Sequence, residues 1–217
     1  LRELVINTYK PTPFQPLVRI VSTINKSDIE AGTVTNFPDI LRNFSGIDLR
    51  NRGSEGVQAD LNILGGTFDQ TMVLINGINF TDPQTGHYSL DTPIELSQIE
   101  RIEVLQGPGA INIITHGNCD SNEVRASITG GSYGFINGTA NRRFSNGYLS
   151  GQIGGNYSQS DGYAENTDFV ISNLFSDVTV SFGSGQSLMF MGGYQHKKYG
   201  ANSFYSVSYP EQFEETR

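Results

Sequence analysis

Residues 149–158 read LSGQIGGNYS, and the pattern of this stretch indicates the kind of fold. Apolar or small side chains stand at every second position, with polar ones between them. A period of two residues predicts a β-strand with two different faces. The apolar face holds Leu149, Ile153 and Tyr157, and the opposite face holds Ser150, Gln152 and Asn156. Strands of about ten residues with this alternation are typical of a transmembrane β-barrel.

The same alternation recurs through the second half of the chain. Residues 124–128 and 188–194 alternate in the same way, and turn signals around Gly147, Gly162 and Gly185 separate the runs. The apolar positions would face lipid in a barrel. They would equally suit a soluble antiparallel sheet with one wet face. The pattern alone leaves both readings open.

Composition agrees with β structure. Charged residues are 17% of the 217 residues, Gly contributes 25 and aromatic residues 11%. The net charge of -8 argues against a nucleic-acid binder, which normally carries a basic face. A single cysteine, Cys119, excludes an internal disulfide. No apolar run reaches the roughly 18 residues of a membrane-spanning helix, and no signal-peptide pattern is present, so we expect any membrane crossing to use strands.

Residues before about 120 predict a small α+β domain. Residues 18–24, 72–75 and 101–105 read as strands, and Asn76-Gly77 is a hairpin turn signal. A helix is expected to begin at residue 35 or 36 and to end at Gly46, because residues 37, 40, 41 and 44 share one apolar face. Residues 27–30 have the spacing of a capping box, but Gly32 follows at once and favours the later helix start.

The sequence contains no catalytic or metal-binding constellation. His87, His116 and His196 lie far apart and without the spacing of metal ligands. No nucleophile or phosphate-binding motif is present. We therefore expect a protein that is not an enzyme, with no cofactor and no metal. Two polar stretches, residues 50–60 and 79–91, are instead predicted to be loops. They are either simply exposed to solvent or bind a ligand from a rigid scaffold.

Four motifs resemble, in order, the plug domain of TonB-dependent outer-membrane receptors. They are DILRNFSGID at residues 39–48, GGTFDQTMVLINGI at 65–78, IERIEVLQGP at 99–108 and INIIT at 111–115. This resemblance covers about residues 3–116. Residues 123–217 resemble the first barrel strands of the same family. SDGY at 160–163, NTDF at 166–169 and YGANSFY at 199–205 are most similar to its cobalamin-receptor-like branch.

The resemblance implies an α+β plug domain over residues 1–118, followed by antiparallel transmembrane β-barrel strands over residues 119–217. Receptors of this class have about 22 strands around the plug. This chain would hold about four strands, which cannot close, so we expect it to be part of a longer receptor. Leu64 and Gln106 stand where the family carries arginines, which pair with barrel acids and hold the plug in the barrel. The resemblance therefore leaves it in question whether such ion pairs hold the plug here. Only Gly109 and Ala110 separate Pro108 from Ile111, where the family has a longer connection.

The implied function is that of a TonB-dependent receptor and transporter in the cell outer membrane of a Gram-negative bacterium. It would bind a scarce, bulky nutrient of the cobalamin or ferric siderophore type and import it into the periplasm. The implied partners are TonB, the nutrient and outer-membrane lipid, with a surface lipoprotein left open and no nucleic acid. A surface-attached or soluble β-rich ligand-binding module without transport activity remains the alternative.

Two sets of residues are predicted to carry this function. The substrate-binding set at the extracellular mouth is Arg50, Asn51, Arg52, Ser54, Glu55, Gln84, Thr85, His87 and Tyr88. The TonB-coupling segment is Glu3, Leu4, Val5, Ile6, Asn7 and Thr8. A β-prone run near a chain end can add a strand to the sheet of a partner. The competing interpretation is that residues 4–6 form the first strand of the plug.

Overall fold

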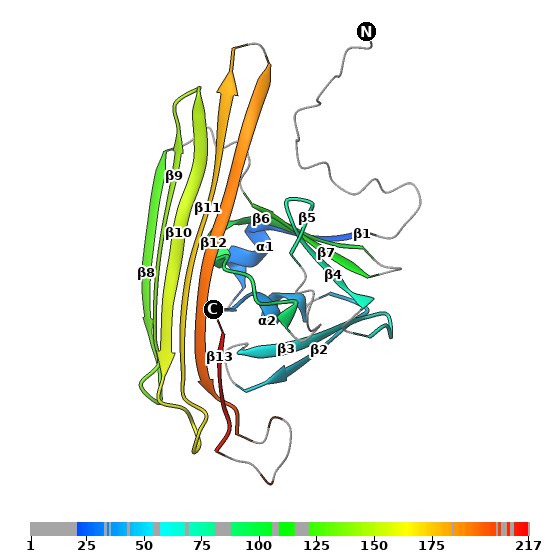
Figure 1. Cartoon of the computed structure of the whole chain (residues 1–217), viewed down its shortest axis with the longest axis vertical. Coiled ribbons are helices and arrows are strands. Elements are labelled where there is room, and N and C mark those ends of the chain that lie inside the picture. The colour runs from blue at the N-terminus through cyan, green and yellow to red at the C-terminus, as the bar shows by residue number, and fades with distance from the viewer. Residues whose placement is uncertain are drawn as a thin grey trace.

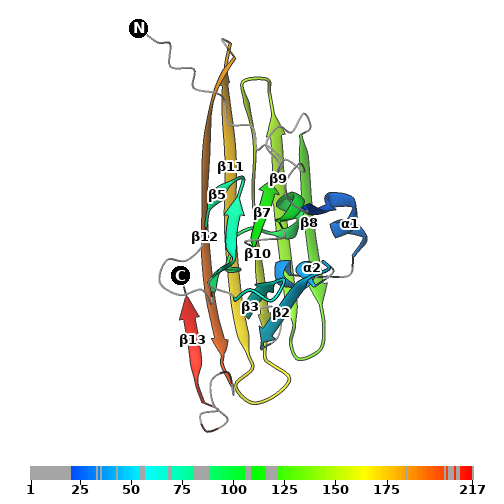
Figure 2. The same ribbon diagram turned by 90° about the vertical axis from the view of Figure 1, so that its right-hand side faces the viewer.

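A computed structural model describes residues 21–32, 34, 36–42, 44–53, 57–67, 70–80, 88–105, 109–115, 122–183, 185–202, 204, 208 and 211–216. It has two parts, which we call the plug (described residues up to 115) and the wall (described residues from 122). Figures 1 and 2 show the plug elements together on one side of a long, curved wall. Within the described residues, no helix is long and apolar enough to cross a membrane.

The plug is built on a mixed five-stranded sheet in the order β1-β6-β7-β4-β5. These strands are β1 (Val21–Asn25), β4 (Met72–Ile75), β5 (Ile78–Asn79), β6 (Ile99–Leu105) and β7 (Ala110–Thr115). β4 and β7 are parallel and the other pairs antiparallel. The predicted turn at Asn76-Gly77 is confirmed, since both residues have positive φ (51° and 81°), as a two-residue hairpin turn requires.

A separate hairpin of the plug corrects one expectation. β2 (Ile47–Arg52) pairs with β3 (Gln58–Ile63), and Arg50 lies opposite Asp60 in the register. The interpretation of residues 50–60 as one loop is therefore wrong over both of its ends. Residues 50–52 and 58–60 are strand, and on β3 nearly every residue is buried, including Leu61 and Ile63 in the core and the polar residues Gln58 and Asp60.

The helices are shorter than the apolar pattern suggests. α2 (Phe37–Leu41) begins as predicted, with Asn36 as its N-cap accepting the backbone N–H of Asp39 at 3.0 Å. The structure also contains α1 (Lys26–Ala31), which the glycine at 32 argued against. Asn25 caps it, and the Asn25 N–H donates to Asp28 Oδ2 at 3.1 Å. A 3₁₀ turn, η3 (Leu96–Gln98), precedes β6.

The wall is one antiparallel sheet in sequence order. Its strands are β8 (Glu123–Gly130), β9 (Ile136–Ser145), β10 (Leu149–Ser160), β11 (Phe169–Phe182), β12 (Gln186–Gly200) and β13 (Phe213–Thr216). The described residues thus hold six strands, where about four were expected. The predicted faces of β10 agree with the structure. Ile153 and Tyr157 are each 46% exposed on the outer side, whereas Gln152 is fully buried.

Plug and wall share a hydrophobic core. Ile102, Ile111 and Ile113 are fully buried in the plug sheet, and Phe175 of β11 is equally buried in the same cluster. Phe175 therefore reaches from the wall into the plug. The outer side of the wall is different, because Val124 and Ile128 are 72% and 84% exposed there. An amphipathic wall with its polar side on the plug is the arrangement expected for a barrel strand.

Candidate ligand face and plug–wall interface

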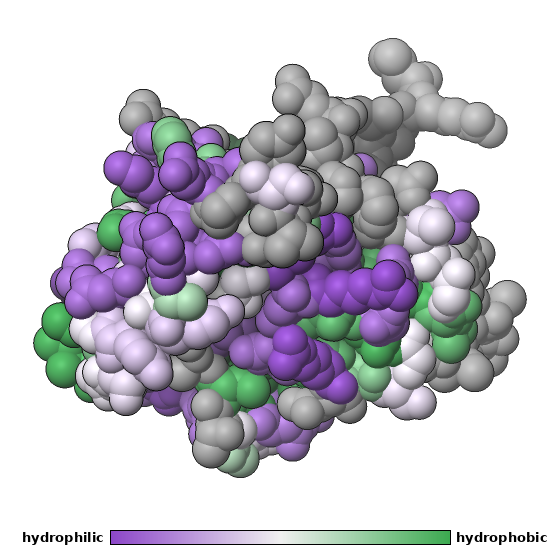
Figure 3. All heavy atoms as spheres, turned by 90° about the horizontal axis from the view of Figure 1, so that it is seen from below, coloured by the Kyte–Doolittle hydropathy of each residue, from purple (hydrophilic) through white to green (hydrophobic). Residues whose placement is uncertain are grey.

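The two ends of the wall differ in their connections. Residues 146–148 and 183–185 join strands at one end, which we call the turn end. Residues 161–168 and 201–212 join strands at the opposite end, which we call the loop end. In Figure 1 the β2–β3 hairpin lies toward the loop end and the β1–β6–β7 strands toward the turn end. Figure 3 looks onto the loop end and shows extensive hydrophilic surface with smaller hydrophobic patches.

The β2–β3 hairpin is fixed to the wall by an apolar cluster at the loop end. Val57, beside the hairpin tip, is 2% exposed and packs with Phe169, Ile171 and Tyr199 of the wall. Close packing also explains Gly53, at which a Cβ would lie 2.6 Å from Val57 Cγ2 and 2.8 Å from Phe204 Cζ. The hairpin therefore presents its polar residues from a rigid support.

The structure separates the two predicted arginines of this hairpin. Arg50 is exposed, and among the described residues it forms an ion pair with Asp48 of its own strand at 3.2 Å. Arg52 instead donates to the backbone oxygen of Phe204 at 2.5 Å and pairs with Asp60 at 3.4 Å. Arg50 is thus available to a ligand, while Arg52 holds the hairpin to the wall.

The other predicted ligand residues divide in the same way. Asn51 donates to Asp39 Oδ1 of α2 at 3.3 Å, inside the plug. The Tyr88 hydroxyl donates to Glu214 Oε2 of β13 at 2.8 Å. The rest of the set, Ser54, Glu55, Gln84, Thr85 and His87, and the coupling segment, residues 3–8, lie outside the described residues, as does the predicted boundary at 118/119.

Inward-facing wall residues form rows, because the strands are in register. Five such rows cross the strands, and they follow one another from the turn end to the loop end. They are Glu123–Arg143–Gln152–Asp177–Met191, Arg125–Asn141–Gly154–Phe175–Gly193, Ser127–Thr139–Asn156–Asn173–Gln195, Thr129–Asn137–Ser158–Ile171–Lys197 and Ser160–Phe169–Tyr199–Glu214. The middle row consists only of neutral hydroxyl and amide side chains.

One plug segment, residues 88–98, crosses these rows, and we call it the strap. Near the loop end Asp91 pairs with Lys197 Nζ at 2.6 Å, and the Thr92 carbonyl accepts from Gln195 Nε2 at 3.0 Å. Near the turn end the Gln98 carbonyl accepts from Gln152 Nε2 at 3.0 Å. The strap therefore bonds to the wall at both of its ends.

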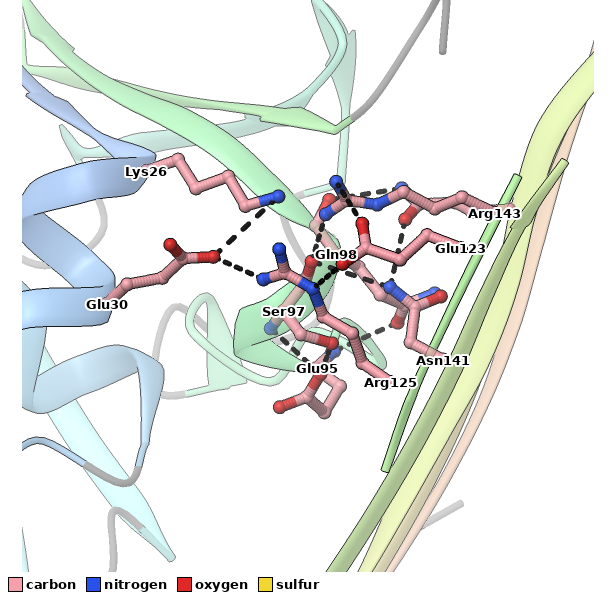
Figure 4. A network of polar contacts seen from close by, with 10 residues as sticks. Lys26, Glu30, Glu95, Ser97, Gln98, Glu123, Arg125, Asn141 and Arg143 are labelled. Carbon is pink, nitrogen blue, oxygen red and sulfur yellow. Dashed lines mark hydrogen bonds and ion pairs between the residues drawn. The ribbon is translucent and has the colours of Figure 1, made fainter. Parts of the chain in front are cut away.

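The turn end of the strap belongs to the polar network in Figure 4. Arg143 donates to the Ser97 carbonyl at 2.5 Å and lies 3.8 Å from Glu123 Oε2. Arg125 of β8 pairs with Glu30 of α1 and with Glu123 at 2.5 Å. The dashed contacts thus link a plug helix, the strap and two wall strands.

The charges in these contacts have a consistent polarity. Across the interface the wall supplies Arg125 and Lys197, and the plug supplies Glu30 and Asp91. The resemblance had implied plug arginines on barrel acids, and Leu64 and Gln106 left that lock in question. In the described residues the ion pairs are reversed, because the cations lie on the wall and the acids on the plug.

Two plug carboxylates have shifted pKa values. The hydrogen bond from Arg125 is the largest cause that lowers the pKa of Glu30 below its ordinary value. Burial raises the pKa of Glu95 in the strap, because desolvation disfavours the charged form. Hydrogen bonds from Ser97, including the Ser97 N–H at 2.8 Å, oppose that rise.

Sequence reasoning missed the strap and its partners on the wall. It treated Pro93 only as a break, and it assigned no role to Lys197 or Gln195. Local pattern gives no signal for them, because His196 and Lys198, the residues that alternate with them, are polar as well. The described residues contain no group of three or more His, Cys, Asp or Glu that could hold a metal ion. The contacts between the strap, α1 and the wall hold the plug by hydrogen bonds and ion pairs.

Comparison with known proteins finds a matching protein family and related transporters. Residues 15–115 match the family described as TonB-dependent Receptor Plug Domain. A vitamin B12 transporter of Vibrio vulnificus is 26% identical over 191 residues, covering 77% of this chain and 31% of that protein. A vitamin B12 transporter of Vibrio cholerae is 32% identical over 106 residues, covering 44% of this chain and 17% of that protein. The chain therefore spans less than a third of the length of these relatives.

Solved structures share the fold at low identity. The pyoverdine outer membrane receptor of Pseudomonas aeruginosa, bound to pyoverdine, has a TM-score of 0.69 at 15% identity, covering 87% of this chain and 28% of that one. The siderophore receptor PiuA of Acinetobacter baumannii has a TM-score of 0.65 at 19% identity, covering 83% and 26%. These neighbours confirm the expected fold, a plug followed by part of a barrel.

Proposed function

Because residues 15–115 match the plug domain of TonB-dependent receptors, we propose that this chain works within such a receptor and that the receptor imports a scarce, bulky nutrient. The receptor binds the nutrient at the loop end and releases it into the periplasm, using energy that TonB transmits. Its relatives are outer-membrane proteins of Gram-negative bacteria, and this chain shares that location.

One observation carries this proposal. A plug with a polar hairpin at one end is bonded to the polar side of a sheet whose other side is apolar. Short turns lie on the periplasmic side of bacterial barrels and longer loops on the extracellular side. By that rule the loop end faces outward, and the β2–β3 hairpin and Arg50 meet the ligand first. The exposed apolar outer face, including Val124 and Ile128, argues against the soluble-module alternative.

Vitamin B12 is the first ligand to test, because the relatives that align with the chain are named as vitamin B12 transporters. Ferric pyoverdine is the second, because a structural neighbour is bound to pyoverdine. The test expresses the complete receptor in a Gram-negative host that lacks its own vitamin B12 transporter. Growth on limiting vitamin B12, or on ferric pyoverdine in the matching strain, supports the proposal. Failure to bind or accumulate either compound contradicts this choice of nutrient.

The coupling segment is proposed at residues 3–8. Strand addition to a partner depends on main-chain hydrogen bonds, so Val5→Ala should matter little and Val5→Pro greatly, because proline removes an N–H and fixes φ. Val5→Pro is expected to keep ligand binding and lose accumulation. Normal accumulation would move the coupling segment elsewhere, and loss of binding as well would assign residues 4–6 to the plug as a structural strand.

A further inference from the structure

Two neighbouring arginines of β9 face opposite sides of the wall. Arg143 is 5% exposed and donates to the Ser97 carbonyl on the plug side. Arg142 points to the outer side and is exposed there. Among the described residues, Arg142 has neither a hydrogen bond nor an ion pair. It lies opposite Val124 and Ile153 in the register, so it is an uncompensated cation within an apolar surface.

Arg142 lies near the turn end of the wall. Only residues 143–145 separate it from the turn at residues 146–148. A strand rises about 3.3 Å per residue and tilts by about 40° in a barrel, so Arg142 lies roughly 10 Å from that turn. Tyr148 on the turn is 74% exposed, as expected for an aromatic girdle at the membrane surface. From this depth the guanidinium can reach lipid headgroups while its methylene stem stays among apolar side chains.

An apolar groove leads from Arg142 toward the loop end. The next two outward positions of β9 are Ala140 and Gly138, so the floor of the groove is low. The sides are higher, because Ile128 of β8 is 84% exposed and Tyr157 of β10 is 46% exposed. The same open depression also includes Ala126, Gly155 and Leu174, with the inward-facing residues between them on the strands. We call it the outer groove.

The charge of Arg142 and the shape of the outer groove fit one phospholipid. A guanidinium binds a phosphate through two parallel N–H groups, and an acyl chain suits a low floor between apolar sides. The directions agree as well. A lipid whose headgroup lies at the turn end extends its chains toward the loop end, as the groove extends from Arg142. A lipid of the other leaflet would bring its chain ends to Arg142 instead.

We propose that Arg142 and the outer groove bind one anionic phospholipid of the leaflet at the turn end. Arg142 binds the phosphate, and Ala140 and Gly138 let one acyl chain lie against β9. An anionic lipid is preferred because Arg142 has no acid beside it, whereas a zwitterionic headgroup already balances its own phosphate. The inference rests on the barrel of the proposed function, which makes this the periplasmic leaflet.

Native mass spectrometry of the delipidated complete receptor, titrated with dioleoyl phosphatidylglycerol, tests the headgroup contact. The receptor should bind one molecule more tightly than it binds dioleoyl phosphatidylcholine, which has the same chains. Arg142→Gln should weaken phosphatidylglycerol binding about fivefold and abolish the headgroup preference, whereas Arg142→Lys should keep most of both. Lys198→Gln is the matched control, because Lys198 is an exposed, outward-facing cation of β12 near the loop end, and it should change nothing.

Filling the outer groove tests the acyl-chain contact. A Cβ at Gly138 would meet Ile128 Cγ1 at 3.9 Å, an ordinary contact, so Gly138→Leu should fit the sheet and occupy the groove. It should weaken binding of both lipids severalfold. Gly192→Leu is the control on the outer side of β12, where a Cβ meets nothing within 4 Å, and it should leave binding unchanged.

The depth of the site is tested in liposomes, with bimane attached to Tyr148→Cys or Gly138→Cys in a receptor without other cysteines. Lipids that carry a nitroxide near the headgroup should quench the label at position 148 more strongly. Lipids that carry it near the chain end should quench the label at position 138 more strongly. The reverse order would run the groove in the wrong direction and would overturn the proposal.

Three other outcomes also overturn it. They are unchanged phosphatidylglycerol affinity in Arg142→Gln, unchanged affinity in Gly138→Leu, and a receptor dimer that Arg142→Gln dissociates. The dimer would assign this face to a second copy of the chain. None of these measurements needs a nutrient or TonB, so a receptor that imports neither vitamin B12 nor ferric pyoverdine would contradict the proposed nutrients while the lipid site is still decided.

Discussion

Arg125 on the inner side of β8 forms an ion pair with Glu30 on plug helix α1. Their side chains are 40% and 46% exposed, so solvent screens the pair and it contributes about 1 kcal/mol or less. By contrast, the Asp91–Lys197 pair at the strap is largely buried. The plug is thus held more loosely at its α1 edge than along the strap.

Charge reversal tests the Arg125–Glu30 contact. Glu30→Lys places a third cation beside Arg125 and Lys26, and we expect faster hydrogen exchange in α1 of the complete receptor. Adding Arg125→Glu should restore part of the protection, because the pair is remade with exchanged charges. Arg42→Glu, at a surface pair within the plug, is the control and should leave α1 unchanged. Absence of rescue in the double variant would show that the ion pair does not hold α1.

The raised pKa of Glu95 gives a pH dependence. A raised folded-state pKa contributes stability below the ordinary carboxyl value of 4.5, and that contribution is lost as pH rises through the folded-state pKa. Glu95→Gln removes the buried charge, so the strap should exchange more slowly than in the wild type at pH 7.5. The two proteins should become alike near pH 4. A difference that persists at low pH would assign the effect to packing instead of charge.

The outer face of β10 should not tolerate charge. Ile153→Arg is expected to cost about 2–4 kcal/mol if it lies near the bilayer midplane. Ser150→Arg on the inward side of the same strand is the control and should cost much less. Gln152 is a poor control, because it is fully buried and bonded to the strap. Unfolding in detergent–lipid mixtures measures both, and equal costs would favour a wet outer face.

The two hairpin arginines should behave differently. Arg50→Ala is expected to weaken ligand binding while leaving the plug as stable as before, because Asp48, its ion-pair partner, is also exposed. Arg52→Ala should destabilise the hairpin by about 1–3 kcal/mol, since it removes charge-assisted bonds to Asp60 and to the Phe204 carbonyl. Binding measured at the cell surface and proteolysis of the hairpin separate the two outcomes. Identical effects on both readouts would contradict this division.

The sequence predicts the parts of this fold that depend on local pattern. The alternation around Ile153 and Gln152 predicts the two faces of β10. Asn76-Gly77 predicts the hairpin between β4 and β5. Both predictions succeed because strand period and turn chemistry are local properties. The strap contacts depend on tertiary register. Pro93 meets Gly193 only once the wall strands are aligned, and no pattern within either segment indicates it.

The α1 helix is an element that the local sequence argued against and that the structure nevertheless contains. Gly32 reads as a stop, yet six residues are enough when Ile29 is buried against the plug core. Tertiary packing supplied what local propensity lacked. The ligand residues remain predictions, since function at Arg50 depends on what the complete receptor places opposite it.

Import by this receptor should require energy from TonB, and paired measurements on whole cells test that requirement. Labelled vitamin B12 bound at the surface and vitamin B12 accumulated inside are measured on the same cells, with and without functional TonB. We expect equal binding in both hosts and accumulation only where TonB works. Accumulation that is equal in both hosts, despite normal binding, would contradict it.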